Sequence, residues 1–163
     1  MGWALPKTEL DNTFLHETVG LKKSPDWVRS RLGIERRYSV LSKEYIRATL
    51  NRDPVQAVIH ARANGETPIT LAVRAAQKAF ARSGVKPDQI GLVVCNCDTP
   101  FDLVPSNAHA IAKALGIGSG PHMDVNTACS SFARHMKHLA DLNEKAWPQF
   151  ALTVQTGCYT TRT

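Results

Sequence analysis

The feature that most constrains the fold is an alternation of strand-like and helix-like segments after residue 89. Residues 90–95 form a continuous apolar run flanked by turn residues, as in a buried strand. The pattern then predicts a helix over 105–115, a short strand over 122–126, a helix from 129 to about 145, and a last strand over 150–155. This order predicts an α/β layer with a mixed, mostly parallel sheet.

The sequence pattern predicts mainly helices in the first half of the chain, up to residue 84. Capping residues predict helices that start at Asp11 or Asn12, at Ser24 and at Thr67, and glycines end them at positions 20, 33 and 84. Between the second and third of these helices, residues 41–64 are polar and helix-permissive, with a restart at Asp53-Pro54. No second sheet is predicted in this region.

The segment 123–132 is the most suggestive of chemistry. A short strand pattern runs into a turn of small residues, and Cys129 opens the next predicted helix. The first N–H groups of a helix lack partners and the helix dipole is positive there, so both stabilise a thiolate and lower a cysteine pKa. A packing role, with the thiol as a small hydrophobic group, remains equally open on position alone.

Composition narrows the setting. At 163 residues the chain suits one domain of ordinary size, and no apolar run approaches the roughly 20 residues that span a bilayer. The first ten residues lack the apolar core of a signal peptide, which predicts a cytoplasmic protein. In that compartment the four cysteines do not suggest a disulfide framework.

The chain is basic, with 20 Lys and Arg against 14 Asp and Glu and a net charge of +6. These charges are dispersed rather than gathered into a stripe, which argues against nucleic acid as a partner. A mildly basic surface suits ligands that carry phosphates, or an acidic protein.

Three weaker motifs favour ordinary structural roles. The glycines of 116–120 follow a helix and lead into a strand, the reverse of a dinucleotide-binding loop, so they indicate a helix stop and a tight turn. Cys95 and Cys97 project from the same face of a strand but no second ligand pair follows, so no metal site is predicted. His135 and His138, beside Arg134 and Lys137, are expected to face solvent.

Several blocks together resemble one family. Residues 26–37, DWVRSRLGIERR, are similar to the pattern D-x-W-x-x-x-R-x-G-I-x-x-R of the β-ketoacyl-acyl-carrier-protein synthase III family of the thiolase superfamily, with Asp and Trp adjacent here. Three further segments resemble other sequence motifs of this family and follow one another in the family's order. They are PDQIGLVV at 87–94, Pro105-Ser106 with the following helix, and DVNTACSSF at 124–132. The resemblance implies a thiolase-like α/β fold. It makes residues 1–163 the N-terminal half of such an enzyme, with an insertion at about 41–66 and the C-terminal half absent.

The resemblance also implies a chemistry. Cys129 would accept an acyl group from acyl-CoA, for decarboxylative condensation with a malonyl thioester carried by acyl carrier protein in fatty acid or secondary-metabolite synthesis. Trp27 would stack on the adenine of coenzyme A and Arg31 would contact the polar part of the nucleotide. Their alternatives are a helix anchor for Trp27 and a surface charge for Arg31. Acyl-CoA would be a substrate, and no cofactor or metal is implied.

The chain departs from the family in two respects. The family's decarboxylating histidine and asparagine belong to its C-terminal half. None of the six histidines in this chain matches that histidine. The sequence leaves open whether His109 lies near Cys129. Val104 stands where the family often has an aromatic residue that bounds the partner's acyl pocket across a dimer. A smaller side chain there predicts room for a longer acyl chain. The 41–66 insertion is equally a lid or a surface loop.

Three functional readings remain open: the nucleophile half of a condensing enzyme, which we favour; an acyltransferase that does not decarboxylate; and a catalytically silent fragment or dimerisation partner. As an isolated half, the chain would expose an apolar surface around Cys129 and the helix that follows it. We expect this surface to pair with the missing half or with a second copy, and it comprises Val125, Ala128, Phe132 and Met136.

Overall fold

The computed structural model describes residues 1–118 and 120–161, which divide into two compact units. The first unit contains Met1–Ala4 and Pro68–Gly157. The second contains Leu5–Thr67 and the chain from Cys158 onward. Within the described residues, no helix is both long and apolar enough to cross a membrane.

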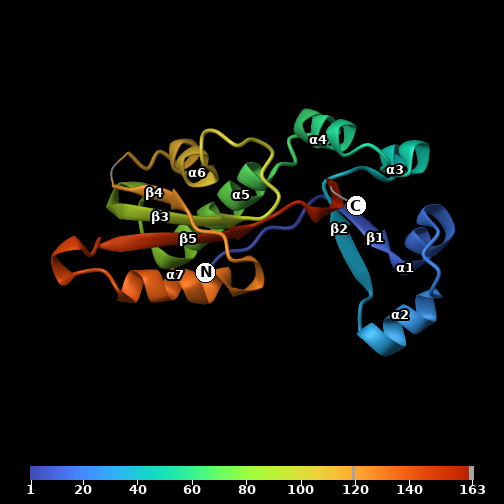
Figure 1. Ribbon diagram of the computed structural model, residues 1–163, viewed down its shortest axis with the longest axis horizontal. Helices are drawn as coiled ribbons and strands as arrows, with labels where there is room; N and C mark the ends of the chain where they lie inside the picture. Colours follow the sequence, from blue (N-terminus) through green and yellow to red (C-terminus); the bar gives the residue numbers. More distant parts are fainter. Residues whose placement is uncertain (119, 162–163) are drawn as a thin grey trace. The chain divides into compact units, whose positions relative to one another are not determined.

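A three-stranded parallel sheet forms the centre of the first unit (Figure 1). Strand β3 (Ile90–Cys97) lies between β4 (His122–Asp124) and β5 (Phe150–Thr156). The predicted parallel sheet is therefore confirmed, with β3 two residues longer than expected and β4 two residues shorter. Because strands alternate their faces, Val93, Cys95 and Cys97 point to one side of the sheet and Val94 and Asn96 to the other.

Helices cover both faces of this sheet. Helices α5 (Pro68–Ser83) and α6 (Asn107–Leu115) bury apolar side chains against the Val93 side, where the core of the unit lies. Helix α7 (Ser131–Ala140) lies on the opposite side, since its Ser131 hydrogen-bonds Asn96. Short 3₁₀ turns precede β3, α7 and β5, at Pro87–Gln89, Ala128–Ser130 and Glu144–Ala146.

Helix α7 corrects one expectation. It was predicted to begin at Cys129 and continue to about residue 145, but it covers only Ser131–Ala140. At its start the chain forms the 3₁₀ turn that holds Cys129. After it, the side chain of Asn143 accepts a hydrogen bond from the Lys145 N–H at 3.0 Å and caps the next 3₁₀ turn, so local polar bonding competes with helix continuation.

The second unit holds a two-stranded antiparallel sheet, β1 (Thr8–Asp11) with β2 (Arg36–Ser39), which the sequence analysis did not predict. Its helical segments are α1 (Asn12–Phe14) continuing into a π-helical turn (Leu15–Val19), α2 (Pro25–Leu32), α3 (Lys43–Thr49), α4 (Pro54–Ala63) and a 3₁₀ turn (Tyr159–Thr161). The predicted caps are confirmed at Asp11, which accepts from the Phe14 N–H, and at Ser24, which accepts from the Trp27 N–H. The stretch predicted as an insertion thus contains α3 and α4.

The glycine-rich turn after α6 has the simple role predicted for it. Gly116 ends the helix with a φ of +73°, and Gly120 has a φ of +87°. A Cβ atom at Gly120 would clash with the carbonyl oxygen of Gly91, so only glycine lets these two backbone segments meet. Ser119 of this motif lies outside the described residues.

Candidate active site around Cys129

Cys129 lies in the 3₁₀ turn directly before α7, and it is the exposed member of the four cysteines. Ser130 is the N-cap residue of α7 but makes no side-chain capping bond. The Ser130 and Ser131 N–H groups donate to the backbone carbonyls of Thr127 and Ala128 within this turn. The helix dipole is positive at this end of α7 and favours negative charge there.

The other three thiols are buried and unsuited to chemistry. Burial raises the pKa of Cys95 far above its ordinary value, with a further increase from the Asp124 carboxylate. Burial likewise raises the pKa of Cys97. Both side chains pack in the core on one face of β3, as predicted, and Cys158 is buried in the second unit. Only Cys129 combines exposure with a helix start.

The loop that leads to Cys129 is held by the strands and by α6. The Asp124 carboxylate accepts hydrogen bonds from the backbone N–H groups of Asn107 and Ala108 and from the Asn107 side-chain amide, at 2.8–2.9 Å. The Val125 N–H donates to the Cys95 carbonyl, and the Asn126 side chain accepts from the Cys97 N–H, both at 2.8 Å. The end of β4 thus fixes the start of the loop that carries Cys129.

Two histidines near this loop have different surroundings, and one of them departs from what the sequence indicated. His135 was expected to face solvent, but its side chain is fully buried with both ring nitrogens in hydrogen bonds, so that expectation was wrong. The error arose because α7 turns the polar residues Ser131 and His135 toward the sheet and leaves the apolar Phe132 and Met136 exposed. His109 is exposed and contacts Ser106 and the ring of His122; among the described residues it makes no hydrogen bond to Cys129.

Val104 lies in the segment between β3 and α6, just before Pro105. Its side chain is 85% exposed, and its neighbour Leu103 is 90% exposed. The peptide bond between Val104 and Pro105 is cis, and Ser106 then caps α6. The segment thus presents two adjacent apolar side chains to solvent, and such exposed apolar side chains are typical of a protein–protein interface.

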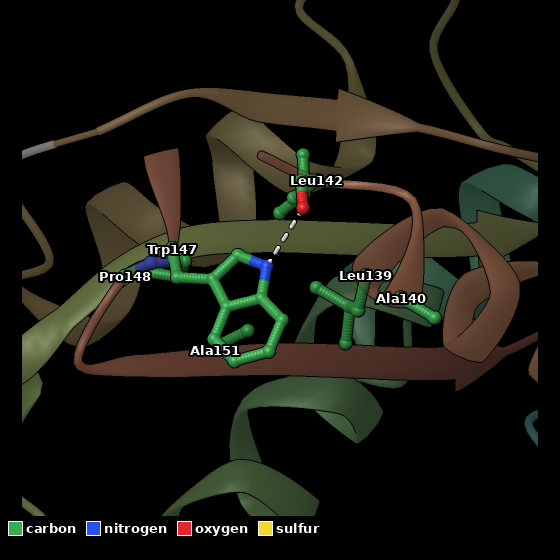
Figure 2. A pocket seen from close by; sticks show the side chains of 6 residues that line it. All are labelled: Leu139, Ala140, Leu142, Trp147, Pro148 and Ala151. Carbon is green, nitrogen blue, oxygen red and sulfur yellow. Dashed lines mark hydrogen bonds between the residues drawn. The ribbon is translucent and has the colours of Figure 1, made fainter. Parts of the chain in front are cut away.

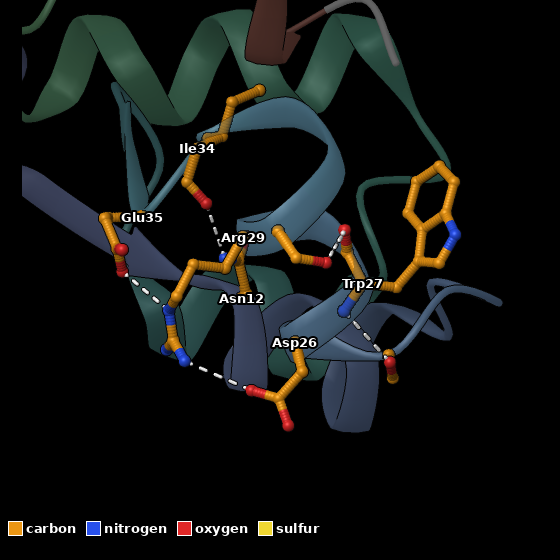
Figure 3. A network of polar contacts seen from close by, with 8 residues as sticks. Asn12, Asp26, Trp27, Arg29, Ile34 and Glu35 are labelled. Carbon is orange, nitrogen blue, oxygen red and sulfur yellow. Dashed lines mark hydrogen bonds and ion pairs between the residues drawn. The ribbon is translucent and has the colours of Figure 1, made fainter.

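Trp27, labelled in Figure 3, lies four residues before Arg31 on α2 in the second unit, so the two share one face of that helix. The Trp27 ring is 39% exposed, and the Lys23 ammonium lies over it at 5.0 Å. Arg29 is bound by Asp26 and Glu35 at 3.1 and 3.0 Å, whereas exposed Arg31 pairs with no other described residue. The helix therefore offers an accessible indole and a guanidinium without an internal partner.

Apolar hollows lie beside α7. One, of about 490 Å³, is lined by Phe132 and Met136 of α7, by alanines of α5 and by β5. Phe132 and Met136 are 55% and 37% exposed, as the sequence predicted for this surface. A second hollow, of about 310 Å³, lies between the end of α7 and the start of β5, where the Trp147 indole N–H donates to the Leu142 carbonyl (Figure 2).

The curated proteins that are similar to this chain share one name, although they do so without support from a family profile. No family profile matches the chain. Curated relatives named β-ketoacyl-[acyl-carrier-protein] synthase III are 34% identical over 131 residues in Rhizorhabdus wittichii and 31% identical over 136 residues in Clostridium perfringens. These alignments cover 80% and 83% of this chain but 34% of each relative. The chain therefore spans about a third of the length of these relatives.

Solved structures agree in fold. The priming β-ketosynthase of the R1128 polyketide biosynthetic pathway is 26% identical with a TM-score of 0.75, covering 98% of this chain and 40% of that one. The 3-oxoacyl-[acyl-carrier-protein] synthase III of Aquifex aeolicus is 22% identical with the same TM-score, covering 98% of this chain and 44% of the other. The chain thus has the fold of part of a thiolase-like ketosynthase.

Proposed function

Because this chain is a relative of the β-ketoacyl-[acyl-carrier-protein] synthase III family, with a thiolase-like α/β fold, we propose that it carries the acyl-loading half of an acyl-condensing enzyme. The observation that carries the proposal is the placement of Cys129, an exposed thiol at the start of α7 between β4 and that helix. In this proposal residues 1–163 form the N-terminal half of the enzyme, and a C-terminal half supplies the rest of the site.

The loading step follows from this placement. The Cys129 thiolate attacks the carbonyl carbon of an acyl-CoA, and a tetrahedral oxyanion forms. Backbone N–H groups at the positive end of α7 are donors of the kind that stabilise an oxyanion. The new bond from carbon to Sγ remains as the bond to coenzyme A breaks, and the leaving thiolate takes up the proton lost from Cys129. No cofactor enters this step.

The remaining steps need groups beyond this chain. Condensation with a malonyl thioester on acyl carrier protein requires a histidine and an asparagine from the other half, in a fatty acid or secondary-metabolite pathway. We propose that this half comes from the remainder of a longer protein or from a separate chain, in a dimeric, cytoplasmic enzyme. The alternatives are an acyltransferase that does not decarboxylate, or a silent dimerisation partner.

Trp27 and Arg31 are proposed to hold the coenzyme A of the donor. An indole that is 39% exposed can stack on adenine, and a guanidinium that pairs with no other described residue can meet phosphate oxygens. The net charge of +6 suits both coenzyme A and an acidic carrier protein.

Mass spectrometry of the intact protein after incubation with a panel of acyl-CoAs tests the proposal. We expect one acyl group on Cys129 and none in Cys129→Ala. Iodoacetamide provides the control, because it labels an accessible thiol without needing an acyl site. Labelling by iodoacetamide without acylation by any acyl-CoA would contradict loading at Cys129 and favour the silent partner.

A further inference from the structure

Two polar residues on α7 are buried against the sheet beneath the Cys129 loop. Ser131 and His135 lie four residues apart on this helix and both have an exposed fraction of 0%. Phe132 and Met136, the next residue after each of them, are exposed. Burying polar groups here costs free energy unless each one finds partners, so their contacts indicate what the pair does.

Ser131 bridges the loop and the central strand. Its hydroxyl donates to the side-chain oxygen of Asn96 on β3 at 2.8 Å. The Ser131 Oγ also accepts a hydrogen bond at 2.8 Å from the backbone N–H of Thr127, which lies two residues before Cys129. The hydroxyl therefore uses its donor on the sheet and an acceptor lone pair on the loop.

His135 makes a parallel bridge to the neighbouring strand. Its Nε2 lies 2.9 Å from the Val125 carbonyl oxygen, and its Nδ1 lies 2.9 Å from the side-chain nitrogen of Gln155 on β5. A carbonyl oxygen only accepts, so Nε2 carries the hydrogen. Nδ1 of the neutral ring then accepts from the Gln155 amide. The ring is thus the neutral Nε2–H tautomer.

The two supporting amides belong to one rung of the sheet. Asn96 and Gln155 are direct partners in the register of β3 and β5. From this rung, Ser131 reaches the N–H of Thr127 and His135 reaches the carbonyl of Val125, so both ends of the short loop before Ala128 are tied down. Ala128 itself has a φ of +49°, a left-handed conformation that is strained for a non-glycine residue and needs support from its surroundings.

We propose that Ser131 and His135, supported by Asn96 and Gln155, are positioning residues that fix the loop carrying Cys129. They touch neither the thiol nor the acyl group in this assignment and act through the backbone of residues 125–128. The effect on acyl transfer rests on the proposed function of Cys129, but the effect on the loop does not.

The test compares His135→Leu, His135→Gln and His138→Leu in the full chain. Leucine fills the volume without a donor, glutamine returns an amide N–H near the position of Nε2, and His138 is a control on the same helix. We expect His135→Leu to slow acylation of Cys129 by acetyl-CoA at least tenfold at saturation, with little change in the half-saturating concentration. We expect His135→Gln to recover to within threefold, and His138→Leu to match the unmodified protein. Equal loss in the leucine and glutamine variants would overturn the positioning role.

Two further readouts separate this proposal from the loading step. Hydrogen–deuterium exchange of residues 125–130 should be faster in His135→Leu and unchanged in His138→Leu, whether or not Cys129 is acylated. Nitrogen NMR of the unmodified protein should show His135 as the neutral Nε2–H tautomer, which needs no variant to fold. If the unmodified protein takes up no acyl group, the loading proposal is wrong. If hydrogen–deuterium exchange is unchanged in His135→Leu, or if the His135 ring is the Nδ1–H tautomer, the positioning proposal alone is wrong.

Discussion

At the scale of single residues, Arg29 and Arg31 lie on the same helix but have different surroundings. Two carboxylates, Asp26 and Glu35, hold the Arg29 guanidinium, whereas Arg31 is exposed and pairs with no other described residue. A cation that is already paired gains less from a phosphate than one that is not, because the carboxylates must first be displaced. Arg31 is therefore the better candidate for contact with coenzyme A.

We expect Arg31→Ala to raise the half-saturating acyl-CoA concentration at least tenfold, since a charge-assisted hydrogen bond contributes roughly 1.5–3 kcal/mol. The acylation rate at saturation should stay within twofold, because the arginine would not contact the reacting atoms. Arg29→Ala is the matched control and should leave both quantities nearly unchanged. Equal effects of the two substitutions in acylation kinetics would show that α2 does not bind the nucleotide through Arg31.

Val104 carries a second prediction at this scale. If its small side chain leaves space in an acyl pocket across a dimer, Val104→Phe should lower the rate with octanoyl-CoA at least tenfold relative to acetyl-CoA. Leu103→Phe, which adds a ring at the adjacent and equally exposed position, should shift that ratio less than twofold. A strict preference of the unmodified protein for acetyl-CoA would remove the basis of the hypothesis.

At the scale of elements, Asp124 links the end of β4 to the start of α6. Its carboxylate accepts three hydrogen bonds from Asn107 and Ala108, so it serves the first turn of α6 together with the Ser106 cap. Acceptors and negative charge at a helix start stabilise that helix. The same residue also begins the loop toward Cys129.

Asp124→Ala should therefore lower the free energy of unfolding by about 2–3 kcal/mol, since it leaves partly buried N–H groups without an acceptor. A urea titration followed by circular dichroism measures this change. Asp141→Ala, which removes an exposed carboxylate paired with Lys137 at the end of α7, should lower the free energy of unfolding much less than Asp124→Ala does. Similar losses in the two variants would mean that Asp124 does not stabilise α6 as described.

Elements with strong local signals were predictable from the sequence. Ser24, Ser106 and Gly116 mark helix ends that the structure confirms, because a cap needs only neighbouring backbone. Strands β1 and β2 were missed since each has four residues and the second begins with two arginines, which leaves little apolar pattern. Their pairing joins segments 25 or more residues apart, and local sequence does not show it.

In the candidate site, too, features set by local sequence were predicted and features set by distant contacts were not. Cys129 was predicted because its strand–turn–helix context and its resemblance to a known block are local. His135 was misplaced because its burial depends on Gln155, which comes from β5, and on Val125, which comes from the loop after β4. Between Arg134 and Lys137 a histidine has the sequence context of an exposed residue. The sequence alone thus identified the nucleophile candidate but not the residues that support its loop.

At the scale of the whole molecule, the chain spans about a third of the length of its curated relatives and leaves an apolar face on α7. Phe132 and Met136 line a hollow of about 490 Å³ together with β5, which is an edge strand of the described sheet. Soluble monomers seldom leave such a face uncovered beside a free strand edge. We therefore expect this face to be covered by the proposed C-terminal half or by a second copy of the chain.

Residues 1–163 alone should consequently associate or aggregate in light scattering, and the pair Phe132→Ser with Met136→Lys should reduce that association. The reason is that the two substitutions remove apolar side chains from the exposed face while leaving Ser131 and His135 against the sheet. Val55→Ser with Ile59→Lys is the matched control, because these residues are 66% and 53% exposed on α4 and line no hollow among those described here. This second pair should leave association unchanged. A monodisperse, folded monomer of the unmodified chain would contradict the prediction, and so would equal relief by the two pairs of substitutions.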